Sequence, residues 1–191
     1  MKPISLALVT LCFAHQALGQ AWPIERDWSS AEEDRYSRWV SSIAQKEWRS
    51  INDAIRSPKY NPLFAPDDRG LHLAADCADL PIMLRAYYAY KRGLPHLITQ
   101  VDGSRYGRRP NKTIRTFDSY AYQGDPQAYF DFVPDVVHTG TYRTAPNATD
   151  SLTYPLKVGP EFVRPGAIFY SPEGHVAVVA DVRPDGPVFL L

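Results

Sequence analysis

The last thirty residues of the chain carry the pattern that limits its fold most. Three short apolar runs, at 167–170, 176–182 and 188–191, are separated by turns that contain proline and glycine. Runs of this length, bounded by such turns, predict antiparallel strands. The first half of the chain shows helical spacing instead, so the sequence predicts an α+β fold with helices packed on a small antiparallel sheet.

The first predicted helix covers about 31–56. Ser30 and Glu33 have the spacing of a capping box at its start, and Ser57-Pro58 is expected to end it. Apolar residues recur along it at helical spacing, namely Tyr36, Val40, Ile43, Ile51 and Ile55, with Trp39 and Trp48 widening the stripe. We interpret these tryptophans, with Trp22 and Trp28, as core or docking residues rather than as a ligand site.

The second predicted helix runs from about Cys77 to Arg92, and Gly93 is expected to stop it. Residues 94–160 have many tyrosines and prolines among short apolar runs, which indicates loops with one or two short helices. Pro134 is expected to interrupt any helix over 127–137.

Residues 1–19 have the pattern of a secretory signal peptide. The stretch 4–14 is almost wholly apolar and small residues follow at 17 and 19, but the run is too short to span a bilayer. We therefore expect a secreted or periplasmic protein with no membrane span after cleavage. Its chain is expected to form an arm and helix over 20–58 and one further domain over 59–191, which the motifs described below mark as the candidate catalytic domain.

Composition excludes two classes of protein. The chain has 21 basic and 21 acidic residues, which excludes a nucleic-acid binder held by bulk positive charge. Its hydrophobic fraction of 45% excludes a wholly disordered chain. Two further features, the sequons at Asn111 and Asn147 and the basic cluster around Arg105 to Arg115, fit surface loops as well as any specific role.

Signal cleavage would remove Cys12 and leave Cys77 as a lone cysteine. It is then a dimer bridge, an inert buried thiol or a reactive one. Pro81 is tolerated only in the first turn of a helix, so a helix start lies close to Cys77, where Asp76 or Asp79 can cap free N–H groups. A helix N-terminus favours a thiolate, whereas the neighbouring carboxylates oppose it.

His175 lies at the start of a predicted strand. A turn at Glu173-Gly174 leads into it, and it shares a strand face with Ala177 and Val179. An imidazole in this position is suited to act as a general base beside a thiol, and it is equally consistent with an edge histidine that has no role in catalysis.

The ordered pair resembles the papain-like amidase fold of the NlpC-type cell-wall peptidases and the related CHAP amidases. The matching residues are Asp76-Cys77, Pro165-Gly166 and Gly174-His175-Val176, within about a third of the chain that follows the signal peptide. The resemblance implies that Cys77 is the nucleophile, that His175 is the base and that backbone N–H groups at the helix start, including that of Cys77, form the oxyanion hole. It implies a cell-wall peptide as substrate and no cofactor.

The chain departs from that family at three places. Ala78-Asp79 follows the cysteine in place of a small pair, and Ala167 stands where an acidic residue is usual. The third polar residue, which orients the histidine, normally lies on the next strand, but 188–191 is wholly apolar and ends the sequence. Either the orienting residue lies elsewhere, or the pair works alone, or the natural protein continues beyond residue 191, which is the alternative that we favour.

Three further residues are candidates for the substrate cleft, and two rival functions remain. Tyr60 and His72 precede the cysteine, and Asp76 adjoins it. The rivals are a transglutaminase-like acyl transferase and a non-catalytic envelope protein on a degenerate papain-like scaffold. The four remaining histidines are too widely spaced for a metal site. The sequence indicates no oligomeric state.

Overall fold

A computed structural model describes the chain at residues 21–101, 113–118, 124–142, 153–157, 159, 161–171 and 173–190. Its helices are α1 (Ser30–Ile43), α2 (Ile51–Ile55), α3 (Asp79–Arg92) and α4 (Pro126–Val136), with 3₁₀ turns η1 (Pro66–Gly70) and η3 (Thr139–Tyr142). Its strands are β1 (Leu97–Val101), β2 (Thr113–Asp118), β3 (Ile168–Tyr170), β4 (Val176–Arg183) and β5 (Gly186–Leu190). The α+β class is confirmed.

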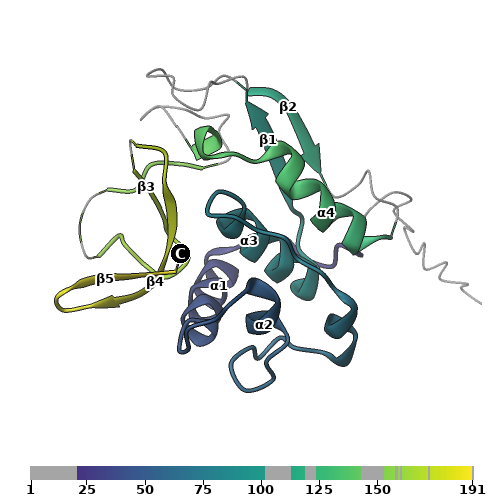
Figure 1. Cartoon of the computed structure of the whole chain (residues 1–191), viewed down its shortest axis with the longest axis horizontal. Helices are drawn as coiled ribbons and strands as arrows, with labels where there is room; N and C mark the ends of the chain where they lie inside the picture. The colour runs from purple at the N-terminus through teal and green to yellow at the C-terminus, as the bar shows by residue number, and fades with distance from the viewer. Residues whose placement is uncertain are drawn as a thin grey trace, which may run out of the picture.

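The helix α3 lies at the centre of the molecule (Figure 1). The antiparallel sheet, with strand order β3-β4-β5, packs through β4 against α1 and α3. The β1–β2 hairpin and α4 lie on another side of α3 (Figure 1). The central helix therefore separates the C-terminal sheet from the hairpin.

The three C-terminal strands predicted from the sequence are confirmed. Ile168 pairs with Val178 between β3 and β4, and Val178 pairs with Leu190 between β4 and β5. The strand β4 is the central strand, and its residues 176–180 are buried. Successive side chains of a strand point to opposite faces, so this continuous run shows that both faces of β4 are covered there.

The single helix predicted over 31–56 is wrong, because the structure has two helices there. The first ends at Ile43, whose carbonyl accepts a hydrogen bond from Trp48 Nε1 at 2.5 Å. The second begins after Ser50, whose side chain accepts from the N–H of Asp53 at 3.2 Å. Serine at this position competes with a continuous helix because its hydroxyl satisfies a free N–H group.

The start of α1 also differs by one residue from the prediction. Its N-cap is Ser29 rather than Ser30, and the hydroxyl of Ser29 accepts from the N–H of Glu32 at 3.3 Å. The Glu33 side chain, expected to complete the capping box, instead pairs with Arg85 of α3.

The middle of the chain is more regular than the sequence indicated. The β1–β2 hairpin was not predicted, and α4 continues past Pro134 to Val136. Asp125 caps α4 by accepting from the N–H of Ala128 at 3.1 Å, and burial of Tyr129, Phe130 and Val133 holds the helix on the core. Packing thus outweighs the one backbone hydrogen bond that proline removes.

The tryptophan-rich first quarter is part of the core, as the sequence indicated. Trp22 and Trp39 are buried, and Trp28 packs against the core while partly exposed. Both buried indoles have acceptors, because Trp22 Nε1 donates to the Leu94 carbonyl at 2.9 Å and Trp39 Nε1 donates to Asn61 at 2.8 Å.

Several expectations lie outside the described residues, namely the signal peptide, both sequons and most of the basic cluster. Within the described part of the chain, no helix is both long enough and apolar enough to cross a bilayer.

Candidate active site

A reciprocal set of hydrogen bonds starts the helix that carries Cys77. The carboxylate of Asp76 accepts from the N–H groups of Ala78 at 2.7 Å and Asp79 at 3.1 Å. The Asp79 carboxylate accepts in return from the N–H of Asp76 at 3.2 Å, and the Asp76 carbonyl accepts from Leu80 at 3.0 Å. This reciprocal pair of aspartates has the pattern of a capping box, and the helix start predicted near Cys77 is confirmed, since α3 begins two residues later at Asp79.

The Asp79 carboxyl is buried at 6% exposure within this turn. In the part of the chain that the structure describes, its Oδ1 has no hydrogen-bond partner. Burial, together with the neighbouring Asp76 charge, raises the pKa of Asp79 to about 6. The turn that carries Cys77 therefore holds a carboxyl whose charged form is disfavoured.

Cys77 is half-buried and its sulfur is a free thiol. The N–H groups on either side of it are used by the capping box, whereas its own N–H has no acceptor among the described residues. A free N–H beside a thiol at a helix start is placed to receive a developing oxyanion.

Tyr142 of η3 reaches the same turn. Its hydroxyl donates a hydrogen bond to the carbonyl of Ala78, the residue after Cys77. The ring is 5% exposed, and burial raises the pKa of its hydroxyl well above the usual range, with nearby Asp79, Tyr36, Asp76 and Cys77 adding to the effect. Tyr142 therefore stays protonated and lies beside the cysteine.

His175 follows a tight turn and immediately precedes β4. The carbonyl of His175 accepts from the N–H of Ser171 at 2.8 Å, and the N–H of Gly174 donates to the Ser171 carbonyl at 2.8 Å. Gly174 has a φ of 93°, a conformation that favours glycine. The imidazole is exposed and the strand that follows is buried, so the ring lies at the edge of the core.

The same 3₁₀ turn that contacts the cysteine helix also contacts the histidine turn. Thr139, at the other end of η3 from Tyr142, is buried, and its Oγ1 lies 3.7 Å from the position that a Cβ on Gly174 would occupy. A 3₁₀ helix rises about 2 Å per residue, so the backbones of Thr139 and Tyr142 are about 6 Å apart along the turn. Immediate neighbours of Cys77 and His175 are thus joined through four residues.

The helix α1 supplies a second connection to the sheet. Along one stripe of α1, Ser37 Oγ donates to the Pro165 carbonyl at 2.8 Å and Ser41 Oγ donates to the Ala180 carbonyl at 3.2 Å. Gly166, with a φ of 89°, lies so close to Tyr36 that an added Cβ would meet the ring at 2.6 Å.

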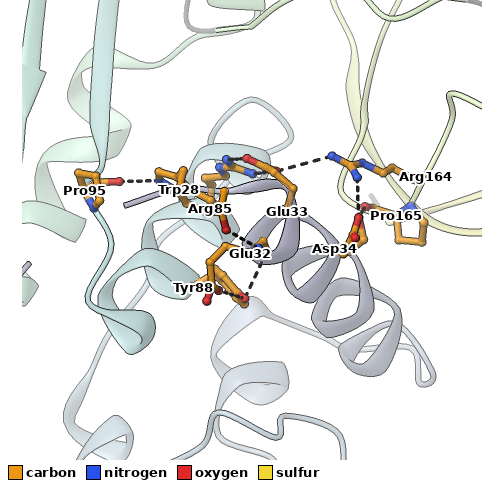
Figure 2. A network of polar contacts seen from close by, with 11 residues as sticks. Trp28, Glu32, Glu33, Asp34, Arg85, Tyr88, Pro95, Arg164 and Pro165 are labelled. Atoms are coloured by element: carbon orange, nitrogen blue, oxygen red, sulfur yellow. Dashed lines mark hydrogen bonds and ion pairs between the residues drawn. The ribbon is translucent and has the colours of Figure 1, made fainter. Parts of the chain in front are cut away.

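Ionic contacts continue this connection towards α3 (Figure 2). Arg164 pairs with Asp34 at 3.1 Å and reaches Glu33 at 3.9 Å. Glu33 also binds Arg85 of α3 through both carboxylate oxygens, and the Arg85 guanidinium lies 3.5 Å from the centre of the Trp28 ring. The segment before β3 is therefore linked through α1 to the helix that follows Cys77.

The other predicted cleft residues have contacts of their own within the described structure, and their role in a substrate cleft remains a prediction. Tyr60 packs on Trp48 with ring centres 5.5 Å apart. The backbone of His72 exchanges two hydrogen bonds with Gln127 of α4, and its side chain is exposed. Asp76 caps the cysteine helix, so its expected contact with substrate remains a prediction.

Thr139 and Tyr142 were missed in the sequence, and no local signal marks them. They lie in a stretch of irregular composition far along the chain from both predicted catalytic residues. Among the described residues, no three His, Cys, Asp or Glu side chains are grouped closely enough to hold a metal ion.

Comparisons with models of known protein families, with curated proteins and with solved structures find no match for this chain. Its function therefore has to be argued from its own residues.

Proposed function

We propose that this protein is a cysteine peptidase or amidase that cleaves an amide bond with Cys77 as nucleophile and His175 as general base. The observation that carries the proposal is the turn η3, in which Tyr142 binds the residue after Cys77 and Thr139 lies beside the residue before His175. A thiol at a capped helix start and an exposed imidazole at a strand start, joined in this way, are suited to nucleophilic catalysis.

In the proposed reaction, His175 takes the proton of the Cys77 thiol and the sulfur attacks the substrate carbonyl carbon. The carbon–nitrogen bond then breaks, and the leaving amine receives the proton from His175. Water, deprotonated by the same imidazole, hydrolyses the resulting thioester and restores the thiol. The N–H of Cys77, which lacks an acceptor among the described residues, would bind the oxyanion.

Cell-wall peptide is the substrate class that we propose, in a secreted or periplasmic setting. This part of the proposal rests on the resemblance of Asp76-Cys77 and Gly174-His175-Val176 to cell-wall peptidases and on the signal-peptide pattern. The exposed imidazole is compatible with a large substrate, because a polymer-linked peptide has to approach from the surface.

The test is digestion of peptidoglycan fragments by the purified protein, with products identified by mass spectrometry. We expect new amine and carboxylate ends in the wild type and none with Cys77→Ala or His175→Ala. A hydrolysis product that both variants still release would contradict the proposed pair. Added primary amine provides a further readout, because a transglutaminase-like enzyme would transfer the acyl group to it in preference to water.

A further inference from the structure

We propose that Tyr142 is a positioning residue, whose hydroxyl holds the Cys77 turn in register with His175. The inference deepens the proposed function and rests on it. Tyr142 lies 64 residues beyond Ala78 along the chain, and its hydrogen bond to the Ala78 carbonyl is a direct side-chain link from η3 to the helix start.

The turn that carries Cys77 is held by local contacts and by one contact from a distant residue. The capping box fixes Asp76 and Asp79 relative to one another, but all of its bonds lie within four consecutive residues. It defines the local shape of the turn and leaves its placement against the rest of the protein to longer-range contacts. The Tyr142 hydroxyl is such a contact, and it acts on the carbonyl of the residue that adjoins Cys77.

The hydrogen bond from Tyr142 to Ala78 is made by a buried, protonated hydroxyl. The Tyr142 ring is buried, and its hydroxyl stays protonated because burial and nearby negative groups raise its pKa. A buried donor without its acceptor is costly, so the hydrogen bond strongly favours one placement of η3 against α3.

The other end of η3 lies beside the turn that precedes His175. Thr139 is 1% exposed and lies beside the Gly174 turn, where an added Cβ on Gly174 would be 3.7 Å from its Oγ1. That Oγ1 has no hydrogen-bond partner among the described residues, so Thr139 acts there by filling space. The turn η3 is also stiffened internally, because the N–H of Thr141 donates to the His138 carbonyl at 2.8 Å and the N–H of His138 donates to Thr141 Oγ1 at 3.1 Å. Its contact with β1 braces it from outside.

A positioning role for Tyr142 predicts an effect on the reactivity of Cys77 that a purely structural role would not produce. Removing the Tyr142 hydroxyl should leave the thiol present and the protein folded, but should loosen the relation between Cys77 and His175. The activation of the thiol by His175 should therefore weaken. The quantity to measure is how strongly the reactivity of Cys77 depends on His175.

The experiment is a double-mutant cycle of Tyr142→Phe and His175→Ala. The rate of Cys77 alkylation by iodoacetamide is measured at pH 6, with peptide mass spectrometry to separate Cys77 from Cys12. In the wild-type background, we expect His175→Ala to lower the rate about tenfold or more. In the Tyr142→Phe background, we expect the same substitution to lower it less than about threefold, since groups that act together are strongly non-additive.

Tyr88→Phe is the matched control. Tyr88 is also buried, lies on α3 and donates its hydroxyl to Glu32 at 2.9 Å, away from the cysteine turn. This variant loses a comparable buried hydrogen bond, and we expect it to keep the full effect of His175→Ala. A reduced effect in Tyr88→Phe as well would assign the result to general loosening and overturn the positioning role.

The other outcomes separate this inference from the proposed function. A full His175 effect in folded Tyr142→Phe would overturn the role of Tyr142 and leave the Cys77–His175 pair intact. No His175 effect in the wild type would overturn the pair and the positioning role with it. If Tyr142→Phe does not fold, Thr139→Ala tests the same turn at its other end. We expect the His175 effect to shrink there too, and an undiminished effect would contradict the inference.

Discussion

The two halves of the molecule that carry Cys77 and His175 are held together in different ways. The helical half is tied by buried charges and aromatic rings: Glu32 is 4% exposed and binds Arg92 at 2.9 Å, and Tyr88 donates to the same carboxylate. The sheet half packs Val176 and Val178 of β4 into the core, but its polar contacts with α1 are those of exposed Arg164 and two serine hydroxyls, beside one glycine contact.

This difference means that the ion pairs in the half that carries the nucleophile are buried, whereas the ion pair that joins the half with the proposed base to α1 is exposed. Buried, hydrogen-bonded pairs strongly favour one arrangement because breaking them leaves a charge without a partner. Exposed ion pairs contribute little. Substitutions in the helical half should therefore destabilise the whole fold, whereas substitutions at the docking contacts should have smaller effects on stability.

The largest expected effect is that of Asp68→Asn in the helical half. Asp68 is fully buried and accepts hydrogen bonds from Lys91 at 2.8 Å, from the Tyr87 hydroxyl at 2.9 Å and from the Ala65 N–H at 2.7 Å. Loss of its charge leaves Lys91 unpaired, so we expect the free energy of unfolding to fall by about 3–5 kcal/mol. Urea unfolding measures it.

The control for Asp68 is Asp181→Asn, in an exposed pair with Arg183 at 3.4 Å. We expect a change below about 0.5 kcal/mol there. Equal effects of the two substitutions would contradict the contrast between buried and exposed charges.

The next effect is that of Gly166→Ala at the docking contact. The backbone conformation disfavours alanine, and the new Cβ would meet Tyr36 at 2.6 Å. We expect a loss of about 2–4 kcal/mol from strain and overpacking together. Gly124→Ala is matched, because φ there is 80° and nothing lies within 4 Å of the new Cβ.

Gly124→Ala should therefore cost only the strain, about 1–2 kcal/mol. The difference between the two glycine variants, measured by thermal unfolding, isolates the docking contact. No difference between them would show that the sheet does not depend on this contact.

A smaller effect is expected from pH through Asp79. Its pKa of about 6 in the folded protein lies above its ordinary value of 3.8, so the folded state holds the proton more tightly than the unfolded chain. The stability that this adds is present below about pH 4 and is lost as pH rises through 6. Asp79→Asn should remove this loss and raise stability at pH 7 by on the order of 1 kcal/mol.

Glu32 gives the matched control with the opposite sign. Its hydrogen bond with Arg92 lowers the pKa of Glu32 to about 2, so its contribution to stability is present above its ordinary value of 4.5 and is lost as pH falls towards 2. At pH 7 the unfolding curves should differ from the wild type in opposite directions, with Asp79→Asn more stable and Glu32→Gln less stable, and both differences should shrink as pH falls towards 3. Parallel curves would contradict the burial of Asp79.

The smallest effect is expected from Arg164→Ala. Its side chain is 44% exposed, and its partner Asp34 is 59% exposed. We expect a loss below about 1 kcal/mol by urea unfolding, and less at high salt because screening weakens exposed pairs. A loss above 2 kcal/mol would show that the ionic contacts in Figure 2, rather than Gly166, hold the sheet on α1.

Local chemistry made part of this structure predictable. The helix start at Cys77 follows from Pro81 and the two aspartates, and the helix end follows from Gly93, which has a left-handed φ of 62°. The C-terminal strands follow from short apolar runs between turns. The start of α2 has a local signal that the prediction of a single helix overlooked, because Ser50 and Asp53 have the spacing of a helix cap.

Other features depend on contacts between distant residues. Pro134 fits within α4 because Tyr129, Phe130 and Val133 are buried, which a local pattern with a proline does not reveal. The link from Tyr142 to Ala78 joins two segments of unlike composition, so no spacing in the sequence marks it. The structure therefore adds the connection between two motifs that the sequence could only place in order.

The most direct test of the central claim is the pH dependence of Cys77 alkylation, in the wild type and in His175→Ala. We predict a wild-type rate already high near pH 6 and a collapse of that rate in His175→Ala, as expected for a thiolate paired with an imidazolium. A wild-type profile with its midpoint near the free-thiol value of about 8.5, unchanged by His175→Ala, would contradict the Cys77–His175 pair.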